Sequence, residues 1–100
     1  MGTQTMKRTT LYVGLVSADG RTKYGSDTVR HYCAVAGVDC TVTEAIGLWR
    51  GKAEHSAVVT VLQEASADGT KLRGLANMLK HELRQEAILV TEDMTVGVLV

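Results

Sequence analysis

Residues 38–62 read VDCTVTEAIGLWRGKAEHSAVVTVL, and this stretch decides the fold. Apolar and polar residues alternate through most of it, which is the period of strands with one buried face. The alternation stops once, at Arg50-Gly51-Lys52, where glycine can supply the positive φ of a tight hairpin turn. We therefore predict two antiparallel strands, at 38–49 and 54–62. Glu44 breaks the apolar face of the first of them, so we expect a bulge or a polar partner there.

One helix and one strand are predicted on the N-terminal side of this hairpin. Residues 9–16 alternate as a first strand. Residues 26–37 then carry apolar side chains at helical spacing, with Ser26 as the expected N-cap and Gly37 as the residue that ends the helix. Residues 1–8 show no periodicity, so we expect a flexible N-terminal tail.

A second helix and further strands are predicted on the C-terminal side. Leucines at helical spacing mark one apolar stripe within residues 66–83. Residues 86–91 are predicted as a fourth strand, Glu92-Asp93 as a turn, and residues 94–100 as a short fifth strand. The order is therefore β-α-β-β-α-β with an extra C-terminal strand, which is the pattern of an α+β, ferredoxin-like fold.

A single domain over residues 9–100 accounts for all of these elements. Right-handed crossovers place both helices on one face of an antiparallel sheet, whose strands run in the order fourth, first, third, second. The other face has no covering layer. The chain contains no Phe, so its core is built from small aliphatic side chains that bury little area each. We therefore expect a homo-oligomer, a dimer or a trimer, in which a second subunit covers the open face.

The composition argues against several classes of partner. Lysine plus arginine equals aspartate plus glutamate, eleven each, so we expect no nucleic-acid partner, and no apolar run is long enough to span a membrane. Cys33 and Cys40 are interpreted as buried thiols in a reducing compartment, so we expect a cytoplasmic protein. Together with His31 they match no zinc-ligand spacing, and the chain has no phosphate-binding loop or dinucleotide motif. We therefore expect neither a metal nor a cofactor.

The strand directions predict where a ligand site would lie. The end of the first strand, the hairpin, the start of the first helix and the start of the fourth strand meet at one edge of the sheet. Cations, an indole ring and a helix N-terminus at that edge are suited to an anion such as a nucleotide. The expected ligand-binding residues are Arg21, Lys23, Ser26, Trp49, Arg50, Lys52, Glu54, Gln85 and Glu86.

The sequence contains no complete catalytic site. Glu54-His55-Ser56 has the residue types of a catalytic triad, but neighbours along a strand point to opposite faces and cannot converge. Our first expectation is therefore a non-enzymatic, oligomeric binding protein for a small anionic ligand. One alternative is a protein–protein interaction module, such as a small accessory protein or a phage-encoded inhibitor. The other is an enzyme of unknown reaction that uses His55, or Glu54 together with Glu86.

Three segments carry a resemblance to known proteins: Leu11-Tyr-Val-Gly-Leu15, Glu44-Ala-Ile-Gly-Leu-Trp-Arg50 and Gln85-Glu-Ala-Ile-Leu-Val90. In this order they resemble a family of uncharacterised small bacterial ferredoxin-like proteins. The resemblance implies the same fold and supports a site near Trp49, Arg50, Glu54, Gln85 and Glu86. More loosely, the chain is similar to the PII and CutA group of trimers, of which PII proteins bind nucleotides between subunits. Here the loop between the second and third strands is only a tight turn, so PII-type partner regulation is not expected.

Overall fold

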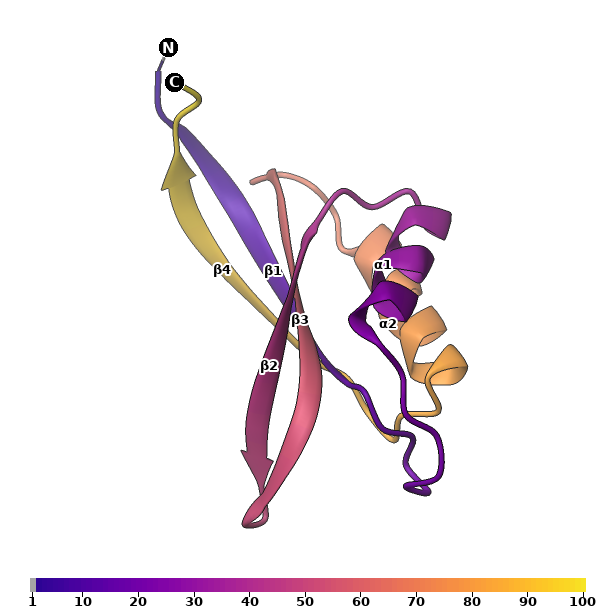
Figure 1. The fold of residues 1–100 in the computed structure, drawn as a ribbon. Helices are drawn as coiled ribbons and strands as arrows, with labels where there is room; N and C mark the ends of the chain where they lie inside the picture. Colours follow the sequence, from indigo (N-terminus) through magenta and orange to yellow (C-terminus); the bar gives the residue numbers. More distant parts are fainter. Residues whose placement is uncertain (1) are drawn as a thin grey trace.

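The computed structural model describes residues 2–100. Its elements follow one another in the order β1 (Gln4–Gly14), α1 (Ser26–Val35), β2 (Thr41–Trp49), β3 (Lys52–Glu64), α2 (Thr70–Glu82) and β4 (Leu89–Gly97). The strands form one antiparallel sheet in the order β2-β3-β1-β4, as predicted. Both helices lie on one side of this sheet, so the fold is α+β and ferredoxin-like (Figure 1).

The β2–β3 hairpin is tighter and longer than expected. Arg50 has a φ of 50° and Gly51 a φ of 78°, which are the two positive values of a two-residue turn. Trp49 pairs directly with Lys52, so β3 begins before the expected residue 54. No bulge is needed at Glu44, because the pairing register is continuous and its side chain is exposed on the edge strand β2.

The strands at the two ends of the chain have different bounds from those predicted. β1 begins earlier than expected, whereas residues 86–88 and 98–100, predicted as strand, lie outside β4. Within the predicted flexible tail of residues 1–8, residues 4–8 form the first part of β1. Residues 4–5 pair with β4 alone, and residues 6–8 pair with both β3 and β4. The separate fourth and fifth strands are one strand, β4, and no turn interrupts it at Glu92-Asp93. Pairing with β1 runs without interruption through these residues, and Arg8 forms an ion pair with Asp93, whose backbone lies opposite it on β4. The predicted fourth and fifth strands are therefore parts of the single strand β4, and the prediction of a turn between them was wrong.

The two helices begin and end differently from one another. Gly25, and not Ser26, occupies the N-cap of α1, and no side chain caps the helix there. Gly37 follows the end of α1 with a φ of 69° and donates its N–H to the carbonyl of Ala34, which confirms it as the terminating residue. At the start of α2, the side chain of Asp68 accepts the backbone N–H of Thr70.

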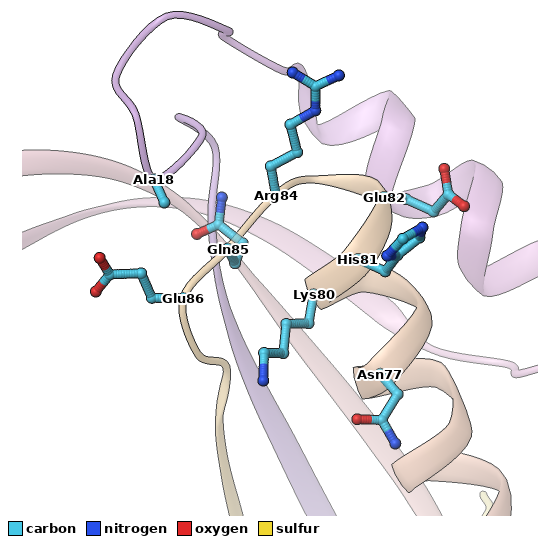
Figure 2. A pocket seen from close by; sticks show the side chains of 8 residues that line it. All are labelled: Ala18, Asn77, Lys80, His81, Glu82, Arg84, Gln85 and Glu86. Atoms are coloured by element: carbon cyan, nitrogen blue, oxygen red, sulfur yellow. The ribbon is translucent and has the colours of Figure 1, made fainter.

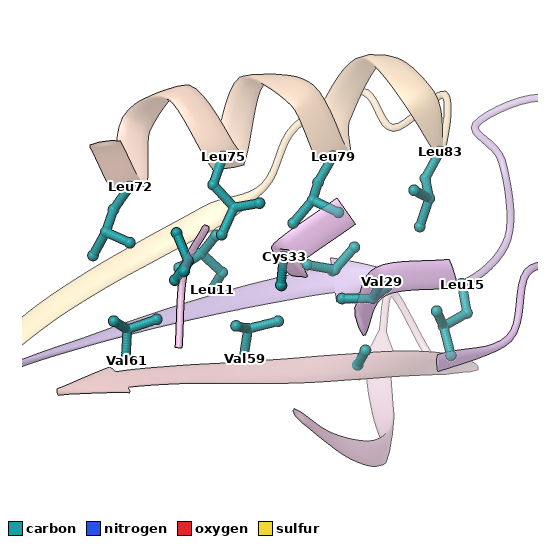
Figure 3. Close-up of a cluster of buried hydrophobic side chains, with 13 residues drawn as sticks. Leu11, Leu15, Val29, Cys33, Val59, Val61, Leu72, Leu75, Leu79 and Leu83 are labelled. Atoms are coloured by element: carbon teal, nitrogen blue, oxygen red, sulfur yellow. The ribbon is translucent and has the colours of Figure 1, made fainter. Parts of the chain in front are cut away.

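The core lies between the helices and the sheet and consists of aliphatic side chains and one thiol. Three leucines of α2 and a fourth at its C-cap point toward the sheet (Figure 3). They are Leu72, Leu75, Leu79 and Leu83. They meet Leu11, Val13 and Val59 of the central strands, with Val29 and Cys33 of α1 completing the cluster. This packing brings the end of α2 beside the end of β1, where Ala18 donates its backbone N–H to the carbonyl of Arg84.

Candidate functional site

The face of the sheet opposite the helices carries a row of small side chains. Gly14 of β1 pairs with Ser56 of β3, and Ser56 pairs in turn with Ala45 of β2. Paired residues in an antiparallel sheet project from the same face, so these three form one row across the sheet. The next row toward the hairpin pairs Gly47 with Glu54. Glu54 therefore projects from the open face with almost no side-chain bulk around it.

Gly14 lies beneath two oxygen atoms that come from distant parts of the sequence. A Cβ at this position would fall within 2.8 Å of both Oε1 of Glu54 and Oε1 of Gln85. That approach is closer than van der Waals contact allows, so a side chain at position 14 would displace the ends of these two side chains. Both side chains are half-buried, and their oxygens converge on one small volume above Gly14.

The side chain of Gln85 is held in place at this position. Its Nε2 donates to the carbonyl of Val16 at 2.9 Å and to the carbonyl of Leu83 at 2.9 Å. Because both donors of the amide are used, Oε1 is the atom left for a ligand. Pairing between β1 and β4 starts only at Leu89, opposite Tyr12, so the chain segment around Gln85 occupies the position beside Gly14. The end of α2 thereby delivers this amide to the open face.

Two acceptor oxygens, one of them from a carboxylate, are suited to a group that carries several N–H donors. A primary ammonium has three N–H donors and a positive charge that a carboxylate stabilises. The centre of the site therefore favours an ammonium, whereas the sequence suggested an anion at this edge.

The predicted cations do not gather around Glu54. Arg50 lies at the tip of the hairpin with its guanidinium carbon 5.6 Å from the centre of the Trp49 ring, and Lys52 follows it. Arg21 and Lys23 lie in the loop that precedes Ser26. Figure 1 shows this loop and the hairpin tip at the same end of the molecule but apart from one another.

A hollow of about 730 Å³ lies beside the end of α2, and Gln85 is part of its lining whereas Gly14 and Glu54 are not. It is lined by Ala18, Asn77, Lys80, His81, Glu82, Arg84, Gln85 and Glu86. Figure 2 shows that its charged side chains point in different directions, with Glu86 extending away from Lys80. Glu86 lines this hollow and Glu54 does not, so the hollow does not bring together the pair that the sequence suggested. Of the nine expected residues, the structure brings together Glu54 and Gln85.

A second hollow, of about 490 Å³, lies along the centre of the open face. It is lined by Arg8, Thr10, Tyr12, Thr60, Thr91, Glu92 and Asp93. Tyr12 is 44% exposed and stands on β1 two residues from Gly14, so it separates this hollow from the row of small side chains. A ligand above Gly14 would meet the tyrosine on one side and the hairpin on the other.

Other titratable groups do not join the site. His55 projects from the helix side of β3, where it pairs with Ile46, so it cannot act together with Glu54 and Ser56. Burial raises the pKa of the Cys33 thiol to about 12, and a hydrogen bond with Cys40 adds to the shift. Within residues 2–100, no group of three or more His, Cys, Asp or Glu side chains is placed to hold a metal ion. No helix in that range is both long and apolar enough to cross a membrane.

Comparison with known proteins gives matches at the level of structure. No family model matches the sequence, and no curated protein matches it either. Two solved structures that share the fold are those of a phage SAM lyase. One, in complex with S-methyl-5′-thioadenosine, has a TM-score of 0.70 and 18% identity over 94% of this chain and 90% of that chain. The other, in the apo state, has a TM-score of 0.60 and 19% identity over 99% and 92%.

This finding corrects the expectation of a non-enzymatic binding protein. The solved structures that share the fold over nearly the whole chain are those of an enzyme, and this finding contradicts that expectation. At this level of identity the likeness itself establishes the fold.

The sequence held a signal for the residues that were missed. Glycine inside a strand weakens it and often marks a place where a ligand or another part of the chain approaches closely. Gly14 and Gly47 both lie inside predicted strands, and both project toward the open face around Glu54. Read together, they would have pointed to this face rather than to the cations of the hairpin.

Proposed function

We propose that the protein is a lyase that cleaves S-adenosylmethionine. The observation that carries the proposal is the convergence of the Glu54 and Gln85 oxygens above Gly14. The fold likeness to a SAM lyase whose structure holds S-methyl-5′-thioadenosine supports it. The methionine part of S-adenosylmethionine carries a primary ammonium, the group for which this pair of acceptors is suited.

The proposed reaction follows from its leaving group, S-methyl-5′-thioadenosine. Release of S-methyl-5′-thioadenosine breaks the bond between the sulfonium sulfur and the γ-carbon of the methionine chain, and the bonding electrons go to the sulfur, which becomes neutral. The γ-carbon must gain a new bond. An oxygen of the substrate's own carboxylate can form it and close a five-membered lactone. No water is consumed, and the positive charge leaves on the ammonium of the aminolactone.

In this scheme Glu54 and Gln85 position the substrate rather than transfer a proton. An amide oxygen cannot act as a base at neutral pH, so pairing it with a carboxylate serves to hold N–H donors. Fixing the ammonium restricts the methionine chain, so that its carboxylate can reach the γ-carbon. Such orientation of two groups within one molecule is a large source of rate acceleration.

Product analysis tests the proposal. The purified protein is incubated with S-adenosylmethionine in H₂¹⁸O, and the products are separated and their masses are determined by mass spectrometry. We expect S-methyl-5′-thioadenosine together with an unlabelled aminolactone. Homoserine labelled directly at its γ-hydroxyl would instead indicate hydrolysis, and the absence of S-methyl-5′-thioadenosine would refute the proposal.

Substitution of the two acceptors tests the site. Glu54→Gln removes the charge that stabilises the ammonium, so kcat/KM should fall by about 10- to 100-fold, the effect of losing one hydrogen bond to a charged group. Gln85→Ala should also lower it. Glu64→Gln is the matched control, since Glu64 lies on the same strand and face but at its far end. Equal activity of Glu54→Gln and Glu64→Gln would contradict the site.

We also propose that the protein works as a homo-oligomer, a dimer or a trimer, in the cytoplasm. Exposed apolar side chains on the two edge strands support assembly, since Ile46, Leu48 and Val96 are each at least 66% exposed. The free thiols Cys33 and Cys40 fit a reducing compartment. The ligand in this proposal is a positively charged nucleoside, which replaces the expectation of a small anionic ligand such as a nucleotide. Light scattering tests the assembly, and a monomer at micromolar concentration would contradict it.

A further inference from the structure

Trp49 shares the open face with the proposed site. It pairs with Lys52 at the tip of the hairpin, while Gly47, two residues earlier on the same face, pairs with Glu54. Trp49 is therefore the diagonal neighbour of Glu54, and such neighbours are about 7–8 Å apart at their Cα atoms, within reach of a large side chain. Its ring is 66% exposed.

The space between Trp49 and the small-residue row is open because position 47 has no side chain. A Cβ on Gly47 would find no atom nearer than 3.9 Å, where it would meet the carbonyl of Glu54 and Oγ of Ser56. Neither the backbone conformation nor a close neighbour requires glycine here, in contrast to Gly14. Since glycine weakens a strand, its presence is best explained by something that must occupy this space.

The Trp49 ring is already placed to attract a positive charge. The guanidinium of Arg50 lies over it at 5.6 Å, within the range of a cation–π interaction, and tryptophan has the most strongly attracting ring of the three aromatic side chains. The sulfonium of S-adenosylmethionine is a fixed cation. The corresponding sulfur of S-adenosylhomocysteine, or of S-methyl-5′-thioadenosine, is neutral.

We propose that Trp49, across the gap at Gly47, is a specificity-determining residue that selects the charged sulfonium over neutral thioethers. This inference rests on the proposed function and deepens it. The reaction removes the charge from sulfur, so the interaction is stronger with bound substrate than with the transition state or the product. It therefore lowers KM and favours product release, and it does not raise kcat.

Calorimetric binding with three ligands tests the inference on the full-length protein. Trp49→Leu should weaken binding of S-adenosylmethionine by about 5- to 30-fold, the range of a desolvated cation–π contact. Binding of S-adenosylhomocysteine and S-methyl-5′-thioadenosine should change by less than about 2-fold. Trp49→Phe keeps an aromatic ring that attracts cations less strongly. Its affinity for S-adenosylmethionine should therefore lie between those of the unsubstituted protein and Trp49→Leu. In kinetics, Trp49→Leu should raise KM without lowering kcat.

Gly47→Val tests the gap independently of the ring. Valine favours a strand, and its Cβ would meet no atom nearer than 3.9 Å, so the melting temperature should not fall, while binding of all three ligands should be lost. Thr43→Val, on the same face of β2 and further from the hairpin, is the control that should bind normally.

Three outcomes would overturn the inference. Equal weakening of all three ligands by Trp49→Leu would show that the ring contacts the adenosine instead. Unchanged binding by Trp49→Leu would show that it contacts none of them, while the proposed lyase function would stand. If the unsubstituted protein neither binds nor cleaves S-adenosylmethionine, the proposed function fails and the inference fails with it.

Discussion

Replacing Gly14 with alanine should separate activity from stability more cleanly than any other single substitution in this chain. The added Cβ would lie 2.8 Å from Oε1 of Glu54 and closer still to Oε1 of Gln85, whereas ordinary van der Waals contact begins at 3.4 Å. Each oxygen must therefore move outward by about 0.6 Å or more, the difference between these two distances. Both acceptors of the proposed site would be displaced together.

The expected loss of activity is large for so small a change. A misplacement of about 1 Å in a positioned group can cost about 10²-fold in rate, so we expect kcat/KM of Gly14→Ala to fall by about 10- to 100-fold. The free energy of unfolding should change by about 1 kcal/mol or less, because alanine suits a strand better than glycine and the clashing atoms are the ends of flexible side chains. Activity would be lost in a folded protein.

The assay is the initial rate of S-methyl-5′-thioadenosine formation, followed by chromatography, alongside thermal unfolding of the same samples. Gly74→Ala, in the exposed part of α2, is the matched control, since a Cβ there would meet no atom within 4 Å. Because alanine favours a helix over glycine, this variant should have a higher melting temperature and unchanged activity. If Gly14→Ala folds and cleaves S-adenosylmethionine at the normal rate, the two oxygens above Gly14 do not form the site. Loss of folding would contradict the stability argument instead.

Three further predictions concern stability and thiol chemistry. Leu79→Ala, at a fully buried position, should reduce the free energy of unfolding by about 2–5 kcal/mol in urea titrations, and a smaller loss would mean that the core relaxes around the cavity. A hydrogen bond from Arg8 lowers the pKa of Asp93, so its contribution to stability is present above the unfolded pKa and is lost as the pH falls through the lower, folded value. Melting temperatures should therefore decline below about pH 4, and less steeply in Arg8→Met; identical profiles would argue against the pairing. At about pH 8, iodoacetamide should modify the half-buried Cys40 before Cys33, whose pKa burial raises to about 12, and peptide mass spectrometry would show the reverse order if Cys33 were accessible.

The strand order and the core follow from local patterns and could be predicted. Alternation along residues 38–62 and the leucine stripe of α2 each report which side of an element is buried, and the glycine turn joins two of the strands. These signals are local in sequence, so no knowledge of distant residues was needed. They were sufficient for the ferredoxin-like topology.

The ends of the strands could not be predicted, because they depend on partners far away in the sequence. Residues 4–8 have no pattern of their own, yet they form strand because β3 and β4 are long enough to pair with them. In the same way, Asp93 looks like part of a turn until Arg8, 85 residues away, pairs with it.

The candidate site was predicted in part, for the same physical reason. Glu54 and Gln85 were both placed at the correct edge of the sheet by chain direction. Their convergence depends on Gln85 being tethered to Val16 and Leu83, and no sequence pattern reveals that contact. The sequence does not show how far the hairpin extends beyond the helices, so it could not reveal that the hairpin tip lies apart from the loop of Arg21 and Lys23 (Figure 1).

The absence of aromatic rings from the buried core has a practical consequence for studying this protein. The sole tryptophan is exposed at the hairpin tip, so its emission is already that of an indole in water before the chain unfolds. Emission spectra should therefore shift little on denaturation and should respond mainly to events at the hairpin. Circular dichroism of the backbone would follow the loss of structure, and a comparison of the two signals would separate occupancy of the open face from folding.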